Sequence, residues 1–579
     1  MANKTLITTF LQNKSYKNPF FLNRWLEKNN FFKFEKKSDY FYHWDSLAKK
    51  KKDQKYLSIF YEKVLKDLSK KLNYKHNVNY NLNYWRIILG PWLYTYITSN
   101  FDRWEILSKA LSDKKLFFTY HSYTTEKFIN LNYKDYIEKI TSSDNYNYKK
   151  YDSILKFRDE KNLNIIKKDK FINVNNFKSQ YLQKLDHLIF ILQKVYFNFF
   201  AYRNKNIFFT SFFKKKNVVS FINSFGKNCN FLIFFSFKNI IKKRDYNKDL
   251  RKEKLSFKPR SLFEKYIKKE IFNELPISYL ERYKYIRSSI LDKKKKKNNI
   301  ITSVEHLEDD VIKVWLAEKI FNKSKLYIYD HSNSLRLLIN DFGHEELISE
   351  KIISCLKNDK KKFINLPELK SSLFRDEKKQ NFNKPQFGSI ILYEGPKYAG
   401  KLISAPAGAS NNIHFNQIIQ FYSKLEKKIK NFVKFKSPPY TSLRINTQKR
   451  VITLFGNDKI FNLDLNLQNV IQSSKIIVCT YPQTTLIEII LSKKPFIILY
   501  PKNLWQFDKN SQKVLKKLKE KKILFFDEKI ASRHINKYWD NLELWWNSKN
   551  VQLLLYDLMK NHFKFESHNQ LWGNFLKKI

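Results

Sequence analysis

The sequence of 579 residues contains few glycines, prolines and cysteines and no long apolar run. Its three cysteines, Cys229, Cys355 and Cys479, are far apart and lack the spacing of metal ligands or of a disulfide framework. We expect them to be reduced, buried thiols of a cytosolic protein. The N-terminal residues lack the apolar core of a signal peptide, and nowhere do about 18 uncharged apolar residues follow one another. We therefore expect a cytoplasmic protein without a membrane-spanning helix.

The charge is strongly one-sided, with 110 Lys and Arg against 54 Asp and Glu and a formal net charge of +56. Such an excess is typical of proteins that bind nucleic acid or anionic membranes. Here Lys, Asn, Ile, Phe and Tyr are all abundant, which is the pattern of a chain coded by A/T-rich codons. We attribute most of the charge to this bias, and we expect the remainder to favour peripheral contact with the anionic inner face of the cytoplasmic membrane.

A chain of this length exceeds the size of a single core and predicts at least two domains. We place an N-terminal α/β domain at 1–355, with a helical insert around 120–300, and a polar, lysine-rich linker at 356–388. A second α/β domain follows at 389–548. The last segment, 549–579, is predicted to form a helix that crosses back to the N-terminal domain.

The most informative stretch is KIIVCTYPQTTLIEIILSKKPFIILYP, residues 475–501. The apolar run 476–479 predicts a strand buried on both faces, and Pro482 then interrupts it. The run 486–491 gives the following helix an apolar face, and 496–500 predicts the next strand. The stretch is therefore a βαβ unit.

Thr484 and Thr485 stand where the helix of this unit begins, and Glu488 lies one turn further on. Free backbone N–H groups and the helix dipole make a helix N-terminus a binding site for anions. Threonines at this place also serve as simple caps, and a glutamate in the first turn also serves as a dipole partner. Two interpretations therefore remain. In the first, Thr484 and Thr485 bind a phosphate and Glu488 accepts hydrogen bonds from ribose or sugar hydroxyls. In the second, the threonines only cap the helix and Glu488 only interacts with the helix dipole.

The N-terminal half offers further polar candidates. The strand 5–9 delivers Thr8 and Thr9 to a loop. Arg86 belongs to an apolar helix that Gly90-Pro91 is expected to kink or split, and Arg103 follows in its continuation. Both arginines are candidate phosphate partners, and ion pairing with Asp102 or another carboxylate is the alternative. The loop 394–410 holds three of the nine glycines, but it lacks the GxxxxGK[ST] pattern of phosphate-binding loops.

Several motifs occur in the order seen in one known family. They are LITT (6–9), YHWD (42–45), YWRIILGPWL (84–93), FDRW (101–104), DDVIKVWLAEKI (309–320), CTYPQTTLIE (479–488), KKPFIILYPKNLW (493–505) and HINKYWDNLELWWNS (534–548). The sequence resembles the transferase family encoded in O-antigen and other surface-polysaccharide gene regions. The Thr-Thr-x-x-Glu pattern is also similar to the donor-binding half of GT-B glycosyltransferases.

This resemblance implies an α/β fold of two Rossmann-like domains in a GT-B-like arrangement, with helical additions in the N-terminal half. It implies a cytosolic transferase, expected to be a glycosyltransferase, that takes a nucleotide-activated donor such as a nucleotide-sugar and acts on a glycan or lipid-linked acceptor. No cofactor is expected. His331 stands where the family carries a His-Gly-Gly turn, and it is the candidate general base. Both glycines of that turn are replaced, by Ser332 and Asn333.

We expect no metal requirement, because no DxD pair stands in a loop and Asp309-Asp310 begins a helix. Two alternatives remain. A basic nucleic-acid-binding protein fits the charge, although no RNP, zinc or polymerase-type acidic motif occurs and no specific nucleic acid is expected. A non-catalytic member of the transferase family fits the lost glycines beside His331.

Overall fold

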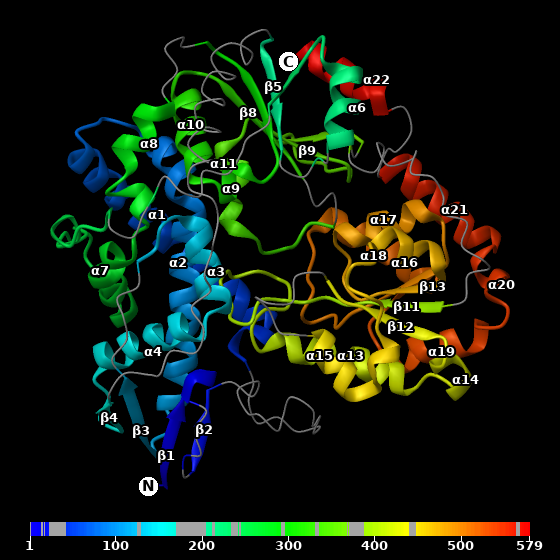
Figure 1. Cartoon of the computed structure of the whole chain (residues 1–579), viewed down its shortest axis with the longest axis horizontal. Coiled ribbons are helices and arrows are strands. Elements are labelled where there is room, and N and C mark those ends of the chain that lie inside the picture. Colours follow the sequence, from blue (N-terminus) through cyan, green and yellow to red (C-terminus); the bar gives the residue numbers. More distant parts are fainter. Residues whose placement is uncertain are drawn as a thin grey trace.

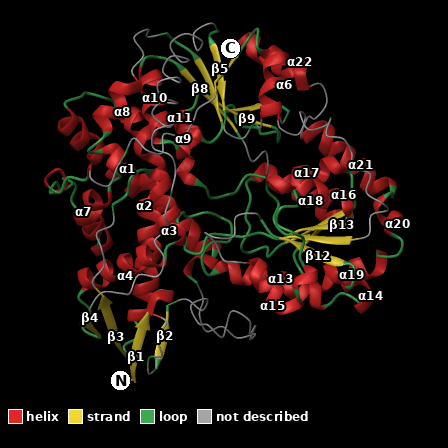
Figure 2. Ribbon diagram, viewed as in Figure 1, coloured by secondary structure: helices red, strands yellow, loops and turns green. Residues whose placement is uncertain are grey.

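Three parallel β-sheets, each flanked by helices, make up this α/β protein (Figures 1 and 2). The computed structural model describes residues 2–12, 16, 18–22, 42–123, 129–168, 204–210, 213, 215–232, 241, 245–290, 296–330, 335–367, 369, 387–438, 447–562 and 568–579. Every strand pairing recorded between the described strands is parallel. The predicted α/β class with Rossmann-like sheets is confirmed.

The N-terminal sheet has the order β2-β1-β3-β4. Its strands are β1 (Ala2–Ile7), β2 (Pro19–Phe21), β3 (Leu116–Tyr123) and β4 (Leu163–Lys168). The short helices η1 (Phe10–Gln12) and η4 (His43–Asp45) follow β1 and precede α1. The larger helices of this part are α1 (Leu47–His76), α2 (Leu82–Leu111), α3 (Tyr133–Ser142) and α4 (Asp144–Arg158).

The helix α2 is buried along almost its whole length. It begins where the side chain of Asn81 accepts a hydrogen bond from the N–H of Tyr84, and it continues through Pro91 to Leu111. The predicted split at Gly90-Pro91 is therefore wrong. The surrounding helices hold α2 together, and a Cβ at Gly90 would lie 2.5 Å from the ring of His344, so the glycine makes room for that ring.

The central sheet has the order β10-β9-β8-β7-β5-β6. Its strands are β5 (Asn206–Phe209), β6 (Asn230–Leu232), β7 (Asn299–Thr302), β8 (Lys325–Tyr329), β9 (Lys351–Ser354) and β10 (Phe363–Asn365). The helices of this part are α6 (Lys215–Phe225), η6 (Asp249–Arg251), α7 (Leu262–Glu274), η7 (Ile277–Tyr279), α8 (Tyr283–Ile290), α9 (Glu305–Glu308), α10 (Asp310–Phe321), η8 (Asp341–Gly343) and α11 (His344–Ile348).

The N-terminal half thus divides its strands between two sheets, where one Rossmann-like domain was expected. The segment around 120–300, predicted to be a helical insert, contains the helices α3, α4, α6, α7 and α8 and also supplies the strands β4 to β7. Short apolar strands such as β5 are surrounded by polar, lysine-rich sequence and give little periodic signal. In the same way β10 extends the central sheet into the predicted linker at 356–388.

The C-terminal sheet has the order β12-β11-β13-β14-β15. Its strands are β11 (Phe387–Ile391), β12 (Val433–Lys436), β13 (Ser474–Cys479), β14 (Phe496–Leu499) and β15 (Leu524–Phe525). Its helices are α13 (Ser410–Ser423), α14 (Lys427–Lys430), α15 (Thr447–Phe455), η9 (Asn457–Lys459), α16 (Leu467–Ser473), α17 (Thr484–Ser492), α18 (Lys509–Glu520), α19 (Glu528–Tyr538) and α20 (Leu542–Trp546).

The end of the chain returns to the central sheet through α21 (Lys549–Asp557), the π-helix η10 (Leu558–His562) and α22 (His568–Lys578). Figure 1 shows α22 beside α6, far from the C-terminal sheet. The Trp572 indole donates to the carbonyl of Pro367 at 2.9 Å, and Asn206 of β5 donates to the carbonyl of Leu576 at 2.6 Å.

The central and C-terminal sheets face one another with the loops at their carboxyl edges. The loop after β8 and the loop after β14 meet in an antiparallel bridge between Leu337 and Phe507. The N–H of Leu338 donates to the carbonyl of Gln506 at 2.9 Å, beside that bridge. In the part of the chain that the structure describes, no helix has the length and apolarity needed to cross a membrane.

Candidate functional site

All three sheets share one feature of strand order that predicts where ligands bind. In each, the first two strands in the chain are neighbours and the third lies on the other side of the first. The connections therefore diverge at β1/β3, at β5/β7 and at β11/β13. In open parallel sheets, ligands bind at the carboxyl ends of the strands next to such a switch point. The turn between β13 and α17 lies at the switch point of the C-terminal sheet.

The N-terminus of α17 is open for a ligand. Gln483 occupies the N-cap position, and no side chain caps the helix among the residues that the structure describes. The N–H of Leu486 already donates to the carbonyl of Gln483 at 2.8 Å, which leaves the N–H groups of Thr484 and Thr485 at the helix start. These two donors and the positive end of the helix dipole form the arrangement that binds phosphate groups in other proteins.

The three predicted residues of this turn lie together but have different surroundings. Thr484 is half-buried. Thr485 is buried, and its hydroxyl lies 2.6 Å from the Tyr481 hydroxyl in a hydrogen bond. Glu488 accepts from the amide of Gln468 at 3.4 Å. The hydroxyl of Thr485 therefore already has a partner within the protein, whereas no hydrogen bond of the Thr484 hydroxyl is recorded among the described residues.

The other two switch points are largely occupied by contacts within the protein. Thr8, after β1, donates its N–H and its hydroxyl to the Gln12 side chain, both at 2.8 Å. Thr9 is fully buried, and its hydroxyl has no hydrogen-bond partner among the described residues. At β5/β7, Thr302 donates to Glu305 at 2.9 Å. Thr8 and Thr9 belong to a different sheet from Thr484.

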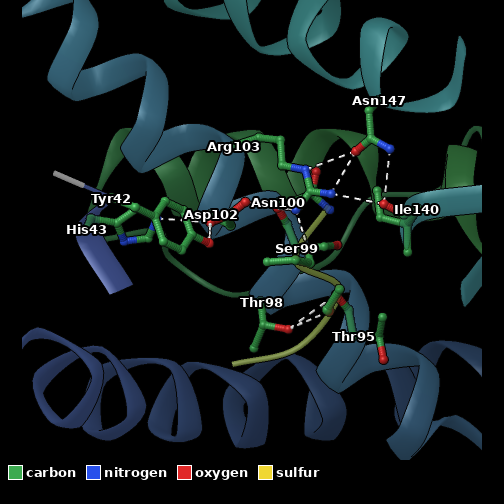
Figure 3. Close-up of polar contacts among 12 residues, drawn as sticks. Tyr42, His43, Thr95, Thr98, Ser99, Asn100, Asp102, Arg103, Ile140 and Asn147 are labelled. Carbon is green, nitrogen blue, oxygen red and sulfur yellow. Dashed lines mark hydrogen bonds and ion pairs between the residues drawn. The ribbon is translucent and has the colours of Figure 1, made fainter. Parts of the chain in front are cut away.

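The Arg103 side chain makes its hydrogen bonds within the protein (Figure 3). Its guanidinium is fully buried and donates to five different residues. The acceptors are Asp102 (2.9 Å), Asn147 (2.7 and 3.1 Å) and the carbonyls of Ser99 (3.3 Å), Ile140 (3.0 Å) and Ala399. Arg103 thus ties α2 to α3, α4 and the loop 394–410.

Arg86 is paired as well. It forms a two-point ion pair with Glu62 of α1, at 2.5 and 2.8 Å. For both arginines the structure favours the ion-pairing alternative over a phosphate contact.

The glycine-containing loop 394–410 packs against helices α2 and α3. Its carbonyls at Gly400 and Leu402 accept from Thr98 (3.1 Å) and Tyr94 of α2. A Cβ at Gly400 would lie 2.6 Å from Thr141 of α3. This glycine serves close packing between the two halves of the chain.

A histidine that the sequence analysis did not select stands beside this junction. The YHWD and FDRW motifs meet, because Asp102 of α2 accepts from the Tyr42 hydroxyl and from His43 Nε2, which is 3.0 Å from Asp102 Oδ1 (Figure 3). The only sequence signal for this pair is that both motifs belong to the quoted resemblance. His331, the predicted base, lies outside the described residues.

The hydrogen bond of His43 has a direction that follows from its partner. A carboxylate only accepts hydrogen bonds, so His43 donates through Nε2. Its other ring nitrogen, Nδ1, is buried and has no partner among the described residues. Burial and the nearby Asp102 raise the pKa of Tyr42 well above its ordinary value, so Tyr42 stays a donor. An imidazole oriented by a carboxylate is an arrangement seen in general bases.

A small pocket lies where α2 meets the loop 394–410. It is lined by Tyr42, Asp102, Tyr151, Lys397, Tyr398 and Gly408, among others. Lys397 at its wall is ion-paired with Asp144 at 2.5 Å. Asp102 thus contributes both to this pocket and to the orientation of His43.

One turn of α13 connects this junction to the β13–α17 turn. Ser410, at the start of α13, donates to Asp45 of the YHWD motif at 2.6 Å. His414 donates through Nε2 to the carbonyl of Thr480, next to the turn, at 2.7 Å. Four residues of helix rise about 6 Å. The YHWD motif and the open end of α17 therefore lie on either side of the beginning of α13.

Among the described side chains, no three His, Cys, Asp or Glu residues are grouped as metal ligands. The polar groups near α17 are hydroxyls, amides, backbone N–H groups and the Glu488 carboxylate. The backbone N–H groups at the helix start are the ones that favour an anion.

Parallel sheets with an open helix N-terminus at a switch point define an α/β protein suited to binding a phosphate-bearing ligand at its strand ends. The model of the LIC12162 family transferase matches residues 4–576, and the chain belongs to that family. The predicted membership of a transferase family is thereby confirmed. No curated protein matches the chain.

Solved glycosyltransferases are distantly similar in structure. The spinosyn rhamnosyltransferase SpnG with spinosyn aglycone aligns over 51% of this chain and 77% of its own, at 10% identity and a TM-score of 0.31. MurG of Acinetobacter baumannii aligns over 65% of this chain and 100% of its own, at 9% identity and a TM-score of 0.31. SpnG with thymidine diphosphate aligns over 64% and 100%, at 9% identity and a TM-score of 0.32.

Proposed function

We propose that this transferase moves a glycosyl group from a nucleotide-activated donor to a hydroxyl of a glycan or lipid-linked acceptor. The product belongs to O-antigen or another cell-surface polysaccharide. The observation that carries the proposal is the uncapped N-terminus of α17 at the switch point of the C-terminal sheet. Membership of a transferase family supports it.

In this proposal the donor phosphates bind at the start of α17. The N–H groups of Thr484 and Thr485 and the Thr484 hydroxyl donate to the phosphate oxygens as the leaving group gains charge. Such preorganised donors stabilise the transition state more than the ground state. Glu488 accepts from ribose or sugar hydroxyls. No metal takes part, because the helix N-terminus supplies the positive potential.

The acceptor hydroxyl needs a base. His43 offers Nδ1, which has no partner among the described residues, and Asp102 holds the ring and would stabilise the imidazolium that forms when the proton is taken. His331 stays a prediction from the sequence resemblance. The variants His43→Gln and His331→Gln distinguish the two candidate bases. Replacing the residue that acts as the base should lower kcat by about 10²- to 10⁴-fold, and replacing the other should not.

We place the reaction in the cytoplasm, at the inner face of the cytoplasmic membrane. A lipid-linked acceptor resides there, and the basic charge of the chain favours an anionic surface.

The test measures nucleotide binding by the wild-type protein and by the Thr484→Ala variant. Binding is detected as a rise in the unfolding temperature with UDP, GDP, CMP, CDP or dTDP. A ligand at about 100 times its dissociation constant adds roughly 2.7 kcal/mol to the folded state. We expect one nucleotide to stabilise the wild type and to stabilise Thr484→Ala less. Stabilisation by no nucleotide, together with a salt-dependent shift on tRNA or duplex DNA, would replace the proposal by nucleic-acid binding. Nucleotide binding without turnover would assign a non-catalytic member.

A further inference from the structure

The exposed side of the helix α1 carries lysines without partners. Six exposed residues of α1 lie three, four or seven positions apart along the chain: Lys52, Lys55, Ile59, Lys66, Lys70 and Tyr74. Each residue turns a helix by about 100°, so these six fall on one stripe, which we call the basic face of α1. Among the residues that the structure describes, no hydrogen bond or ion pair of its four ammonium groups is recorded.

Four half-buried lysines of α1 are ion-paired instead. These pairs are Lys49–Asp53 (2.6 Å), Lys63–Glu264 (3.2 Å), Lys71–Glu253 (3.1 Å) and Lys75–Glu253 (3.4 Å). Glu62, beside the basic face, pairs with Arg86. Asp67 accepts from the backbone N–H groups of Ser256 and Phe257. The recorded partners of these acidic residues are thus other groups, and the charge of the basic face is left to solvent or to a ligand.

Large apolar side chains are exposed beside these lysines. Ile59 is 61% exposed and Tyr74 is 85% exposed, in a helix whose opposite side is buried in the core. The chain that leads into α7 packs along α1, where Lys63 donates to the carbonyl of Lys258 at 2.8 Å. The helix α7 then begins with Leu262, which is 56% exposed. Exposed apolar side chains rimmed by polar residues mark interaction sites.

The helix α18 shows that exposed lysines alone are a different feature. All residues of α18 are described, and its exposed lysines include Lys509, Lys516 and Lys519, yet it exposes no large apolar side chain. Such lysines follow from the basic composition of the chain. The combination of unpaired lysines with exposed Ile59 and Tyr74 distinguishes α1 from α18 and indicates a partner with both anionic and apolar parts.

The lipids of a membrane surface have both parts. Anionic headgroups attract lysines near the surface, and apolar side chains enter the boundary between headgroups and acyl chains. A nucleic acid would pair with the lysines, but its backbone offers no apolar environment to aliphatic side chains such as Ile59 and Leu262. Single-stranded bases stack on several aromatic rings, and Tyr74 is the single aromatic residue of the basic face. The basic face therefore fits a lipid surface better.

The basic face also begins close to the candidate base. The helix α1 starts directly after the YHWD motif, where the Ser46 side chain accepts from the N–H of Lys49 at 3.3 Å. Lys52 follows Asp45 of the motif by seven residues, which is a rise of about 10 Å along a helix. A membrane surface along α1 would thus lie near the motif that carries His43.

We propose that the basic face of α1 docks this protein on an anionic lipid surface, with its lysines at the headgroup phosphates and with Ile59 and Tyr74 among the headgroups. The inference rests on the lipid-linked acceptor of the proposed function, and it names the surface of the chain and the class of lipid. Because α1 has 30 residues and a length of about 45 Å, it contacts several headgroups at once. The contacts are weak singly and add up along the helix.

The test measures co-sedimentation of the full chain with vesicles of phosphatidylcholine alone and of equal parts of phosphatidylcholine and phosphatidylglycerol. We expect binding to the anionic vesicles, release from them by salt, and little binding to the neutral vesicles. Lys66→Gln/Lys70→Gln should weaken binding about tenfold or more, because both lysines lie at the headgroups. The control Lys509→Gln/Lys516→Gln in α18 removes the same charge and should change binding little.

The variant Ile59→Gln tests the apolar contact. It should weaken binding to the anionic vesicles severalfold and leave the unfolding temperature unaltered, because the side chain is exposed. Duplex DNA and tRNA serve as further anionic ligands. Tighter binding to either nucleic acid than to the vesicles, with no effect of Ile59→Gln, would assign the basic face to nucleic acid and overturn the inference.

The remaining outcomes separate the docking surface from the proposed function. Absence of wild-type binding to the anionic vesicles would overturn the docking surface and leave the nucleotide-activated donor standing, since nucleotides test that donor. Equal losses in the α1 and α18 double variants would show that net charge alone acts and would overturn the role of the basic face. Vesicle binding through α1 by a protein that binds no nucleotide would support the docking surface and overturn the proposed donor.

Discussion

The surroundings of Arg103 and the turn before α17 are both polar, and they differ in how completely their hydrogen bonds are satisfied. The Arg103 guanidinium donates to acceptors on α2, α3, α4 and the loop 394–410. At α17 no side-chain cap is recorded among the described residues, and Thr484 is only half-buried. Both places carry residues that the sequence marks as phosphate partners.

The difference separates framework from binding site. A donor whose hydrogen bonds all go to the protein must break them before it can hold a ligand, and a buried pair that loses one partner is costly. A donor without a partner in the protein breaks no hydrogen bond within the protein when it binds a ligand. Polar residues without a recorded partner, such as Thr484, are therefore the ones to test for ligand binding.

The largest effect is expected at Arg103, whose hydrogen bonds are made within the protein. Arg103→Met removes the ion-pair partner of Asp102 and the donor to Asn147 Oδ1 and should lower the free energy of unfolding by about 3–5 kcal/mol. Arg86→Met is the control, because Glu62 in its ion pair has a side chain that is 44% exposed, and such pairs contribute about 1 kcal/mol or less. Urea unfolding measures both. Equal losses in the two variants would break the comparison.

Acid should weaken the support of the α17 turn. Burial lowers the pKa of His414 to about 4. Between pH 6.5 and 4 the unfolded chain binds a proton that the folded protein excludes, so stability is lost as the pH falls through this window. The shift corresponds to roughly 3 kcal/mol.

We expect His414→Gln to flatten the decline of the unfolding temperature between pH 6.5 and 4, because glutamine does not titrate. Part of the decline should remain in this variant, because burial also lowers the pKa of His76 to about 4 and His76 still titrates. An unchanged slope in His414→Gln would show that other groups control the acid response.

At the start of α17, a single backbone N–H group can be removed by substitution with proline. Proline is well tolerated at the first position of a helix and lacks the N–H group. Thr484→Pro should therefore keep the fold and weaken nucleotide binding about tenfold, which is about 1.4 kcal/mol. Thr484→Ala removes the hydroxyl alone and should weaken binding less. Titration calorimetry measures both, and unaltered affinity in Thr484→Pro would place the phosphates elsewhere.

The smallest effect is expected at Thr485. Thr485→Val removes the hydroxyl that bonds to Tyr481 and should cost about 1 kcal/mol of stability. Nucleotide affinity should not change, because the backbone N–H remains. A loss of affinity with unaltered stability would move Thr485 from the framework to the binding site.

Much of the local structure could be predicted from the sequence. The apolar run 476–479, Pro482 and the apolar face 486–491 predict β13, the turn and α17, and the structure has them at those places. The strand predicted at 496–500 is likewise present as β14. These elements depend on residues close together in the chain, whose periodicity is visible in the sequence.

The sequence did not predict two sheets in the N-terminal half, and it left open whether α2 is kinked or split at Gly90-Pro91, of which the split is wrong. Strands of three or four residues, such as β5 and β6, give too little periodicity to stand out from polar sequence. The packing around Pro91 comes from helices distant in the chain, and tertiary contacts outweigh the local cost of a proline.

The sequence by itself determined the α/β class, the βαβ unit at 475–501 and the identity of the polar residues at its turn. Only the tertiary structure decided which polar residues are already paired. Asp102 reaches both His43 and Arg103, and Glu62 of α1 pairs with Arg86 of α2. The reason is physical: a helix or strand follows from neighbours in the chain, whereas the partner of a buried charge comes from wherever the fold brings another chain segment.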